Sequence, residues 1–97
     1  MEREQFINVG FGNFVARDRI IAILDYHSLP ARRLKSQAEK ELRLLDATAG
    51  RKTRSLLVTE SHCVLSGLAS HTIQERLENR RMAGMPEQEN DLEQFIS

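Results

Sequence analysis

Two apolar runs of the chain, residues 42–47 and 53–59, are separated by a short segment that contains Gly50. Glycine readily takes the positive φ that a tight turn between two strands requires. The pattern therefore predicts a β-hairpin with Gly50 at its turn. Arg51 and Lys52 would lie at the tip of this hairpin. Such a tip suits contacts to phosphate, and it also suits a solvated loop whose charges keep strand edges from pairing.

The first quarter of the chain reads as strands and glycine turns. Residues 5–9 alternate polar and apolar side chains and run into Gly10 and Gly12, which we expect to form a turn. Residues 14–16 and 19–24 are rich in β-branched and other apolar residues. A nearly continuous apolar run is typical of a strand covered on both faces, so we predict that this is the central strand.

Two helices are predicted on either side of the proposed hairpin. Ser28 is a capping residue and Pro30 falls in the first turn, so a helix begins here and continues to about Glu41. Its narrow apolar stripe consists of Leu34, Ala38 and Leu42. Residues 62–66 predict a further short strand, and Ser70 or Thr72 can cap a second helix that runs to about Arg81. Its expected inner face holds Ile73, Leu77 and Met82. This order predicts an α+β fold with a small, mainly antiparallel sheet and two helices.

The chain has 97 residues, enough for one domain with a modest core. We place this domain at residues 1–82 and expect residues 83–97 to form an acidic tail that is disordered or weakly attached. The formal net charge is zero, but the tail holds four acidic residues and no Lys or Arg. The remaining body therefore carries 14 basic and 10 acidic residues, a balance of +4.

Several classes of function lack support in the sequence. The only cysteine, Cys63, excludes an intramolecular disulfide, and no signal peptide or membrane span is evident, so we expect a cytoplasmic, soluble chain with no membrane partner. Cys63 and His62 are adjacent on a predicted strand and would face opposite sides, which disfavours shared metal binding. The glycines around Phe11 lack the pattern of a nucleotide site. We predict no enzyme, cofactor, metal or small-molecule substrate. Asp46 could cap the turn or pair with Arg51.

The cations form groups along the chain that folding could bring onto one face. These groups are Arg17 and Arg19; Arg32, Arg33 and Lys35; Arg51, Lys52 and Arg54; and Arg80 and Arg81. Basic side chains neutralise phosphates without an assembled catalytic geometry. Aromatic residues make up only 5% of the chain, which argues against a stacking surface for single strands. Duplex DNA is therefore the predicted partner.

Four segments of the chain resemble the extracellular matrix regulatory protein RemA family. They are Phe6-Ile7-Asn8-Val9-Gly10-Phe11-Gly12-Asn13, Arg19-Ile20-Ile21, Pro30 with Arg33, and Asp46-Ala47-Thr48-Ala49-Gly50-Arg51-Lys52-Thr53-Arg54. The resemblance covers about residues 5–80. It implies a small bacterial DNA-binding regulator with a fold similar to the LytTR DNA-binding domain, assembled into a ring that binds DNA around its outside. In the best-known members this activates biofilm matrix and osmoprotection genes.

The resemblance also assigns roles to individual positions. It places the DNA-contacting arginines of the family at Arg51 and at the next position, which is Lys52, and functionally sensitive positions at Arg19 and Pro30. Lysine keeps the charge but lacks the planar fork of arginine, so phosphate contact is expected there more than base readout. The predicted DNA-binding residues are Arg51, Lys52, Arg54, Arg19 and Arg33, and the predicted turn residues are Gly10, Gly12, Gly50 and Pro30. The resulting hypothesis is a homo-oligomeric transcriptional regulator. The alternative is a protein-interaction adaptor whose basic face pairs with an acidic partner or with the tail.

Overall fold

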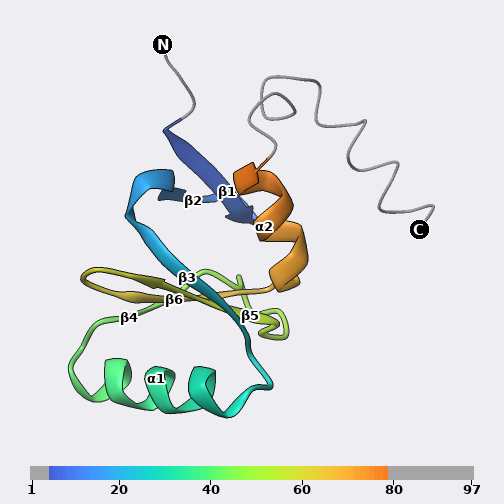
Figure 1. Cartoon of the computed structure of the whole chain (residues 1–97). Helices are drawn as coiled ribbons and strands as arrows, with labels where there is room; N and C mark the ends of the chain where they lie inside the picture. Colours follow the sequence, from blue (N-terminus) through green and yellow to red (C-terminus); the bar gives the residue numbers. More distant parts are fainter. Residues whose placement is uncertain (1–4, 79–97) are drawn as a thin grey trace.

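The computed structural model describes residues 5–78 of the chain (Figure 1). Two helices and six short strands form an α+β fold, as predicted. The elements in order are β1 (Phe6–Gly10), β2 (Asn13–Ala16), a 3-10 helix (Arg17–Arg19), β3 (Ile20–Asp25), α1 (Leu29–Lys40), β4 (Leu44–Asp46), β5 (Ser55–Thr59), β6 (Cys63–Ser66) and α2 (Ser70–Glu78). Met82 and the predicted tail lie outside the described residues.

Strands β3 to β6 form one sheet, and β1 and β2 form a separate antiparallel pair. The order in the larger sheet is β3-β5-β6-β4. The pairs β3–β5 and β5–β6 are antiparallel, whereas β4 and β6 are parallel. It follows that the two outer strands, β3 and β4, run in the same direction. Parallel strands need a long crossover connection, and α1 supplies it (Figure 1).

The predicted hairpin between residues 42–47 and 53–59 is wrong. Strand β4 pairs with β6, and the β5–β6 hairpin lies between β3 and β4. Residues 47–54 therefore form a loop, the basic loop, that passes the end of β6. The prediction failed because two neighbouring apolar runs indicate strands but not which strands pair. Gly50 nevertheless has a φ of 81°, which agrees with its predicted role in a turn.

The predicted central strand is also wrong. The 3-10 helix Arg17–Arg19 divides residues 14–24 into β2 and β3, which belong to different sheets. Strand β3 lies at an edge, and its Ile21 side chain is 66% exposed. The central strands are β5 and β6. Neighbouring residues Leu56 and Leu57 of β5 are both fully buried because they face opposite sides of the sheet.

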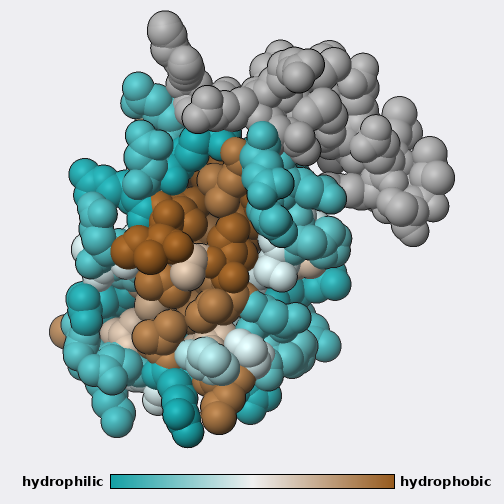
Figure 2. Space-filling view, viewed as in Figure 1, coloured by the Kyte–Doolittle hydropathy of each residue, from teal (hydrophilic) through white to brown (hydrophobic). Residues whose placement is uncertain are grey.

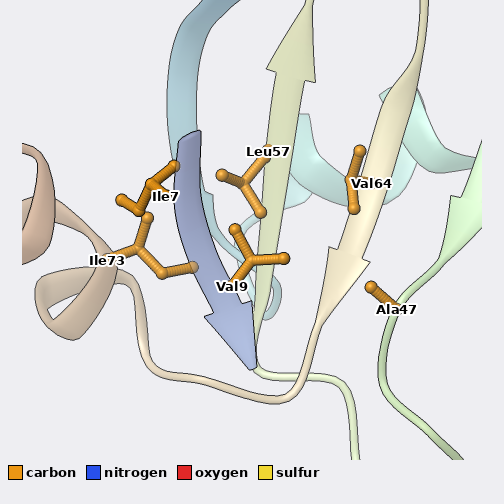
Figure 3. Packing of buried hydrophobic residues seen from close by; sticks show 6 residues of the cluster. All are labelled: Ile7, Val9, Ala47, Leu57, Val64 and Ile73. Atoms are coloured by element: carbon orange, nitrogen blue, oxygen red, sulfur yellow. The ribbon is translucent and has the colours of Figure 1, made fainter. Parts of the chain in front are cut away.

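The sheet is covered on both faces, which gives the molecule two cores. On one face, Leu57 and Val64 pack against the β1–β2 pair and α2, mainly at Ile7, Val9 and Ile73 (Figure 3). On the other face, α1 packs on the sheet. The second core consists of Ala31, Ala38, Leu56, Cys63 and Leu65. The middle strands β5 and β6 contribute residues to both cores, so the sheet is packed between α1 on one face and the β1–β2 pair with α2 on the other.

Both helices begin where the sequence predicts, and the predicted end of the second helix, near Arg81, lies outside the described residues. The Ser28 hydroxyl accepts a hydrogen bond from the Ala31 amide (3.3 Å), and Pro30 lies in the first turn of α1. Ala38 of the predicted stripe is buried, but Leu34 is partly exposed and Leu42 is 90% exposed, because α1 ends at Lys40. The second helix begins at Ser70 and directs Ile73 and Leu77 into the first core, as predicted.

Candidate nucleic-acid interface

The basic loop lies at one end of the sheet and is fastened to β6 at both of its ends. The Ala47 amide donates to the Leu65 carbonyl (2.9 Å), and the Arg54 amide donates to the Ser66 carbonyl (2.8 Å). The side-chain amide of Asn13 donates to the Ala47 carbonyl (3.3 Å) and so links the loop to the turn between β1 and β2. Two segments far apart in the sequence therefore lie beside the basic loop. They are the β1–β2 turn (residues 10–13) and Gly67, where a β-carbon would lie 3.6 Å from the Lys52 carbonyl oxygen.

The loop has a defined internal structure. One carboxylate oxygen of Asp46 accepts hydrogen bonds from the Thr48 hydroxyl (2.7 Å) and the Thr48 amide (2.9 Å). These bonds stabilise the ionised carboxylate and lower the pKa of Asp46. The chain then turns through Ala49 and Gly50, which both have positive φ, and the Arg51 amide donates to the Thr48 carbonyl (3.0 Å). Of the two roles expected for Asp46, the structure gives it the turn-capping one.

Three of the predicted DNA-binding residues lie together on this loop. The side chains of Arg51, Lys52 and Arg54 are all exposed. The Arg51 guanidinium carbon is 3.9 Å from the centroid of the Phe11 ring. The Arg54 backbone is fixed on two sides, because its carbonyl accepts from the Tyr26 amide (3.2 Å) while its amide bonds to β6. The loop thus presents three cations from a backbone that is held at several points.

Arg33 and Pro30 belong to an element that starts at the same end of the sheet. Residue Tyr26, which bonds to Arg54, lies three residues before the first residue of α1. Arg33 is exposed and lies four residues into this helix, about 6 Å along its axis. The start of α1 therefore adds charge near the basic loop, on the opposite side of the sheet from the β1–β2 turn.

Arg19 lies at the other end of the sheet. It precedes β3, in which Ile20 pairs with Thr59 at one end and Asp25 pairs with Ser55 at the other. A strand of six residues is about 20 Å long, which is the approximate separation of the two ends. The Arg19 guanidinium forms an exposed ion pair with Glu60 (3.0 Å). The structure therefore does not bring Arg19 to the basic loop within one chain, and its role in DNA binding or a subunit contact stays a prediction.

The Cys and His residues considered for metal binding or catalysis make contacts that are typical of structural side chains. Cys63 is buried, as expected of a small apolar side chain, and burial raises the pKa of its thiol while nearby Arg43 opposes the increase. The Ser61 hydroxyl is 2.8 Å from His62 Nδ1 at the surface. Within residues 5–78, no three His, Cys, Asp or Glu side chains cluster closely enough to hold a metal ion. No helix in the same range is long and apolar enough to cross a membrane.

Sequence reasoning misses two features that shape the interface. In the sequence Phe11 stands only as a spacer between glycines, yet its ring lies against Arg51. From the sequence, Gly67 only terminates a predicted strand. In the structure, a β-carbon at this position would lie 3.0 Å from the Phe11 ring. The glycine therefore makes room for the aromatic ring. A bulky residue between two turn glycines is the available signal, but its partner cannot be identified without the fold.

Comparison with known proteins agrees with the family resemblance found in the sequence. The family described as extracellular matrix regulatory protein A-like matches residues 6–77. A protein from Oleidesulfovibrio alaskensis named "Putative regulatory protein" is 48% identical over 77 residues, which cover 78% of this chain and 92% of that protein. A protein of the same name from Fervidobacterium nodosum is 48% identical over 90 residues and covers 92% of both chains. A third, from Maridesulfovibrio salexigens, is 49% identical over 77 residues, covering 78% of this chain and 90% of its own.

Proposed function

Because this chain belongs to the extracellular matrix regulatory protein A-like family and its relatives described above carry the name "Putative regulatory protein", we propose that it is an oligomeric transcriptional regulator that binds duplex DNA. The observation that carries the proposal is the basic loop. Arg51, Lys52 and Arg54 are exposed on a segment that is hydrogen-bonded to β6 at both ends. A loop held in this way loses little conformational freedom when its cations meet phosphate oxygens.

The chemistry of the loop favours contacts to the DNA backbone. Exposed Arg and Lys side chains neutralise phosphates and release bound counterions, which requires no base sequence. Lys52 acts as a point charge, whereas the planar guanidinium of Arg51 can donate two parallel hydrogen bonds to two oxygens of one phosphate. Three cations on one loop give weak affinity, so we propose that several copies of the loop engage the same duplex.

Exposed apolar side chains support assembly of several chains. A groove runs between β2 and the strands β4 and β6, and its apolar lining includes Phe14, Val15, Leu45 and Val64. Phe14 is 60% exposed and Leu45 is 51% exposed. Figure 2 shows a continuous band of apolar residues on the face viewed in Figure 1. A second copy of the chain that covered this band would remove the cost of its exposure to water.

We propose a closed ring as the form of this assembly, following the family resemblance, together with its LytTR-like architecture. A head-to-tail contact that closes repeats each basic loop at regular intervals around the outside. Duplex DNA could then contact several loops in succession. Arg19 and its partner Glu60 lie far from the loop, and Arg19 also lines the apolar groove. We therefore assign Arg19 to the contact between subunits rather than to DNA.

The experiment that tests the proposal compares two double variants that remove the same charge. Arg51→Ala with Lys52→Ala should abolish tight binding to a duplex of some tens of base pairs. The control, Lys35→Ala with Lys40→Ala, removes two cations from α1 and should retain binding. The slope of log K against log salt is negative, and its magnitude should decrease by about 0.9 for each phosphate that the variant no longer neutralises. Equal affinity and equal salt slope for the Arg51 and Lys52 variant and the unmodified protein would refute the assigned site.

Light scattering on the same samples tests the assembly. We expect a mass of several chains in both double variants, because neither changes the apolar groove. A monomer that bound DNA as tightly as the unmodified protein would refute multivalent binding. The two measurements together separate loss of the site from loss of the ring.

A further inference from the structure

Phe11 has a backbone conformation that a bulky residue rarely adopts. Gly10 pairs with Asn13 in the β1–β2 hairpin, so Phe11 and Gly12 are the two central residues of the turn. Their φ angles are 56° and 83°. A two-residue turn with positive φ at both positions favours Asn, Asp or Gly, because a large side chain is strained there. The fold therefore bears a conformational cost at Phe11 that a glycine would avoid.

The Phe11 ring does not belong to either core. Phe11 is 43% exposed and is absent from both clusters of buried side chains. One face of the ring is covered by Arg51, whose guanidinium carbon is 3.9 Å from the ring centroid. The ring edge faces Gly67, where a β-carbon would lie 3.0 Å from Cε2 of Phe11. The strained turn thus places an aromatic ring between a glycine and the first cation of the basic loop.

From this geometry we propose that Phe11 is a positioning residue that holds the Arg51 guanidinium for contact with phosphate oxygens. The inference rests on the proposed function of the basic loop. An aromatic ring attracts a guanidinium through the electron density on its face. Stacking covers the flat side of the guanidinium and leaves the N–H groups at its edge free to donate. The ring also limits the rotamers of a long side chain, which would otherwise lose this freedom on binding DNA.

The arrangement distinguishes Arg51 from its neighbours. Among the residues that the structure describes, Arg51 is the one cation of the basic loop stacked on an aromatic ring. Lys52 has no planar group to stack. We therefore expect Arg51 to make the directional, two-pronged contact with phosphate, and Lys52 and Arg54 to contribute charge. The β1–β2 turn becomes part of the interface although it carries no charge of its own.

The test uses Phe11→Leu, which removes the aromatic ring, and Phe11→Tyr, which retains it. Phe6→Leu is the matched control, because Phe6 is 56% exposed on β1 and lies away from the turn. The stack is present both before and after binding, so its loss lowers affinity only through the side-chain freedom that Arg51 regains, a decrease of about 2- to 10-fold for each loop that engages the duplex. Phe11→Leu should show this decrease without a change in salt slope, because every charge remains. Phe11→Tyr and Phe6→Leu should bind like the unmodified protein.

A second variant approaches the ring from its other side. Gly67→Ala leaves every charged and aromatic residue in place, but its β-carbon would lie 3.0 Å from Cε2 of Phe11, so the ring must shift by a few tenths of an ångström. We expect Gly67→Ala to weaken duplex binding in the same direction as Phe11→Leu. Circular dichroism establishes that each variant is folded before its affinity is interpreted.

Two readouts separate failure of this inference from failure of the proposed function. In the free protein, the NMR resonances of the Arg51 side chain should be shifted by the ring current of Phe11, and the shift should vanish in Phe11→Leu. In an Arg51→Ala background, Phe11→Leu should have no further effect on DNA affinity. An unshifted Arg51 resonance, or an equal effect of Phe11→Leu with and without Arg51, would overturn the inference. Unchanged DNA binding by Arg51→Ala would instead refute the proposed function, while the NMR shift would still test the stacking.

Discussion

Leu57→Ala tests the description of β5 as a central strand that packs against the layer formed by the β1–β2 pair and α2. Leu57 is fully buried in the core between the sheet, the β1–β2 pair and α2. In the sheet it pairs with Ile23 of β3 and Val64 of β6, and Figure 3 shows it beside Val9 of β1. Its surroundings are regular strands and a helix, which cannot easily move to fill a cavity. The substitution should therefore cost more than the transfer free energy of the deleted atoms.

The magnitude follows from the atoms removed. Three buried carbons at about 0.8 kcal/mol each give about 2.4 kcal/mol of transfer free energy. A cavity that does not collapse brings the total to about 3–4 kcal/mol, within the range of about 2–5 kcal/mol observed for buried Leu→Ala substitutions. A domain of this size has a free energy of unfolding of about 5–10 kcal/mol. Leu57→Ala should therefore remove a large share of the stability and leave a protein that still folds.

Urea denaturation followed by circular dichroism measures this change. With a denaturant slope near 1 kcal/mol/M, the midpoint should fall by about 3 M. Leu42→Ala is the control: Leu42 is 90% exposed, so its midpoint should change little. Each curve is recorded at two protein concentrations, because an assembly would add a dependence on concentration. A destabilisation below about 1 kcal/mol for Leu57→Ala would contradict the packing around β5.

Two further predictions concern polar groups. The buried Ser66 hydroxyl donates to the Val9 carbonyl (2.8 Å) and accepts from the Leu68 amide (3.0 Å), so Ser66→Ala should lower the free energy of unfolding by about 1–3 kcal/mol in urea denaturation, whereas Ser36→Ala on the exposed face of α1 should not. Equal midpoints for the two variants would contradict this role. The lowered pKa of Asp46 stabilises the fold above the ordinary aspartate pKa of about 3.9, and this contribution is lost as pH falls through the lower pKa of the folded state. Asp46→Ala should therefore reduce stability more at pH 7 than at pH 2, and a penalty that did not depend on pH would argue against the charged hydrogen bonds.

Features set by neighbouring residues could be predicted from the sequence. The start of α1 depends on Ser28 and Pro30, which act on amides and dihedrals within the same turn. The β1–β2 turn depends on Gly10 and Gly12, which both have positive φ. The burial of Ile73 and Leu77 follows from helical spacing in α2. In each case the information lies within a few residues along the chain.

Strand pairing could not be predicted in the same way. The apolar runs that become β4 and β5 are adjacent in sequence, which suggested a hairpin. Three-residue β4 instead pairs with β6 because α1 carries the chain across the sheet and returns it parallel to β3. The same crossover leaves β3 at an edge despite its apolar composition. Which strands pair depends on how all the strands together bury their apolar side chains on the two faces of the sheet. A pattern confined to neighbouring residues cannot indicate that arrangement.

The corrected pairing strengthens the argument for the basic loop as a binding site. At the tip of a hairpin, Arg51 and Lys52 would extend from two strands into solvent. In the observed fold the loop is hydrogen-bonded to β6 at both ends, and Asn13 and Phe11 contact it from a different sheet. Preorganised cations lose less entropy on binding than mobile ones, so this loop should bind phosphate more tightly than its charge alone implies. The position of the charges was evident from the sequence, but the contacts that hold the loop join segments that lie far apart in the chain.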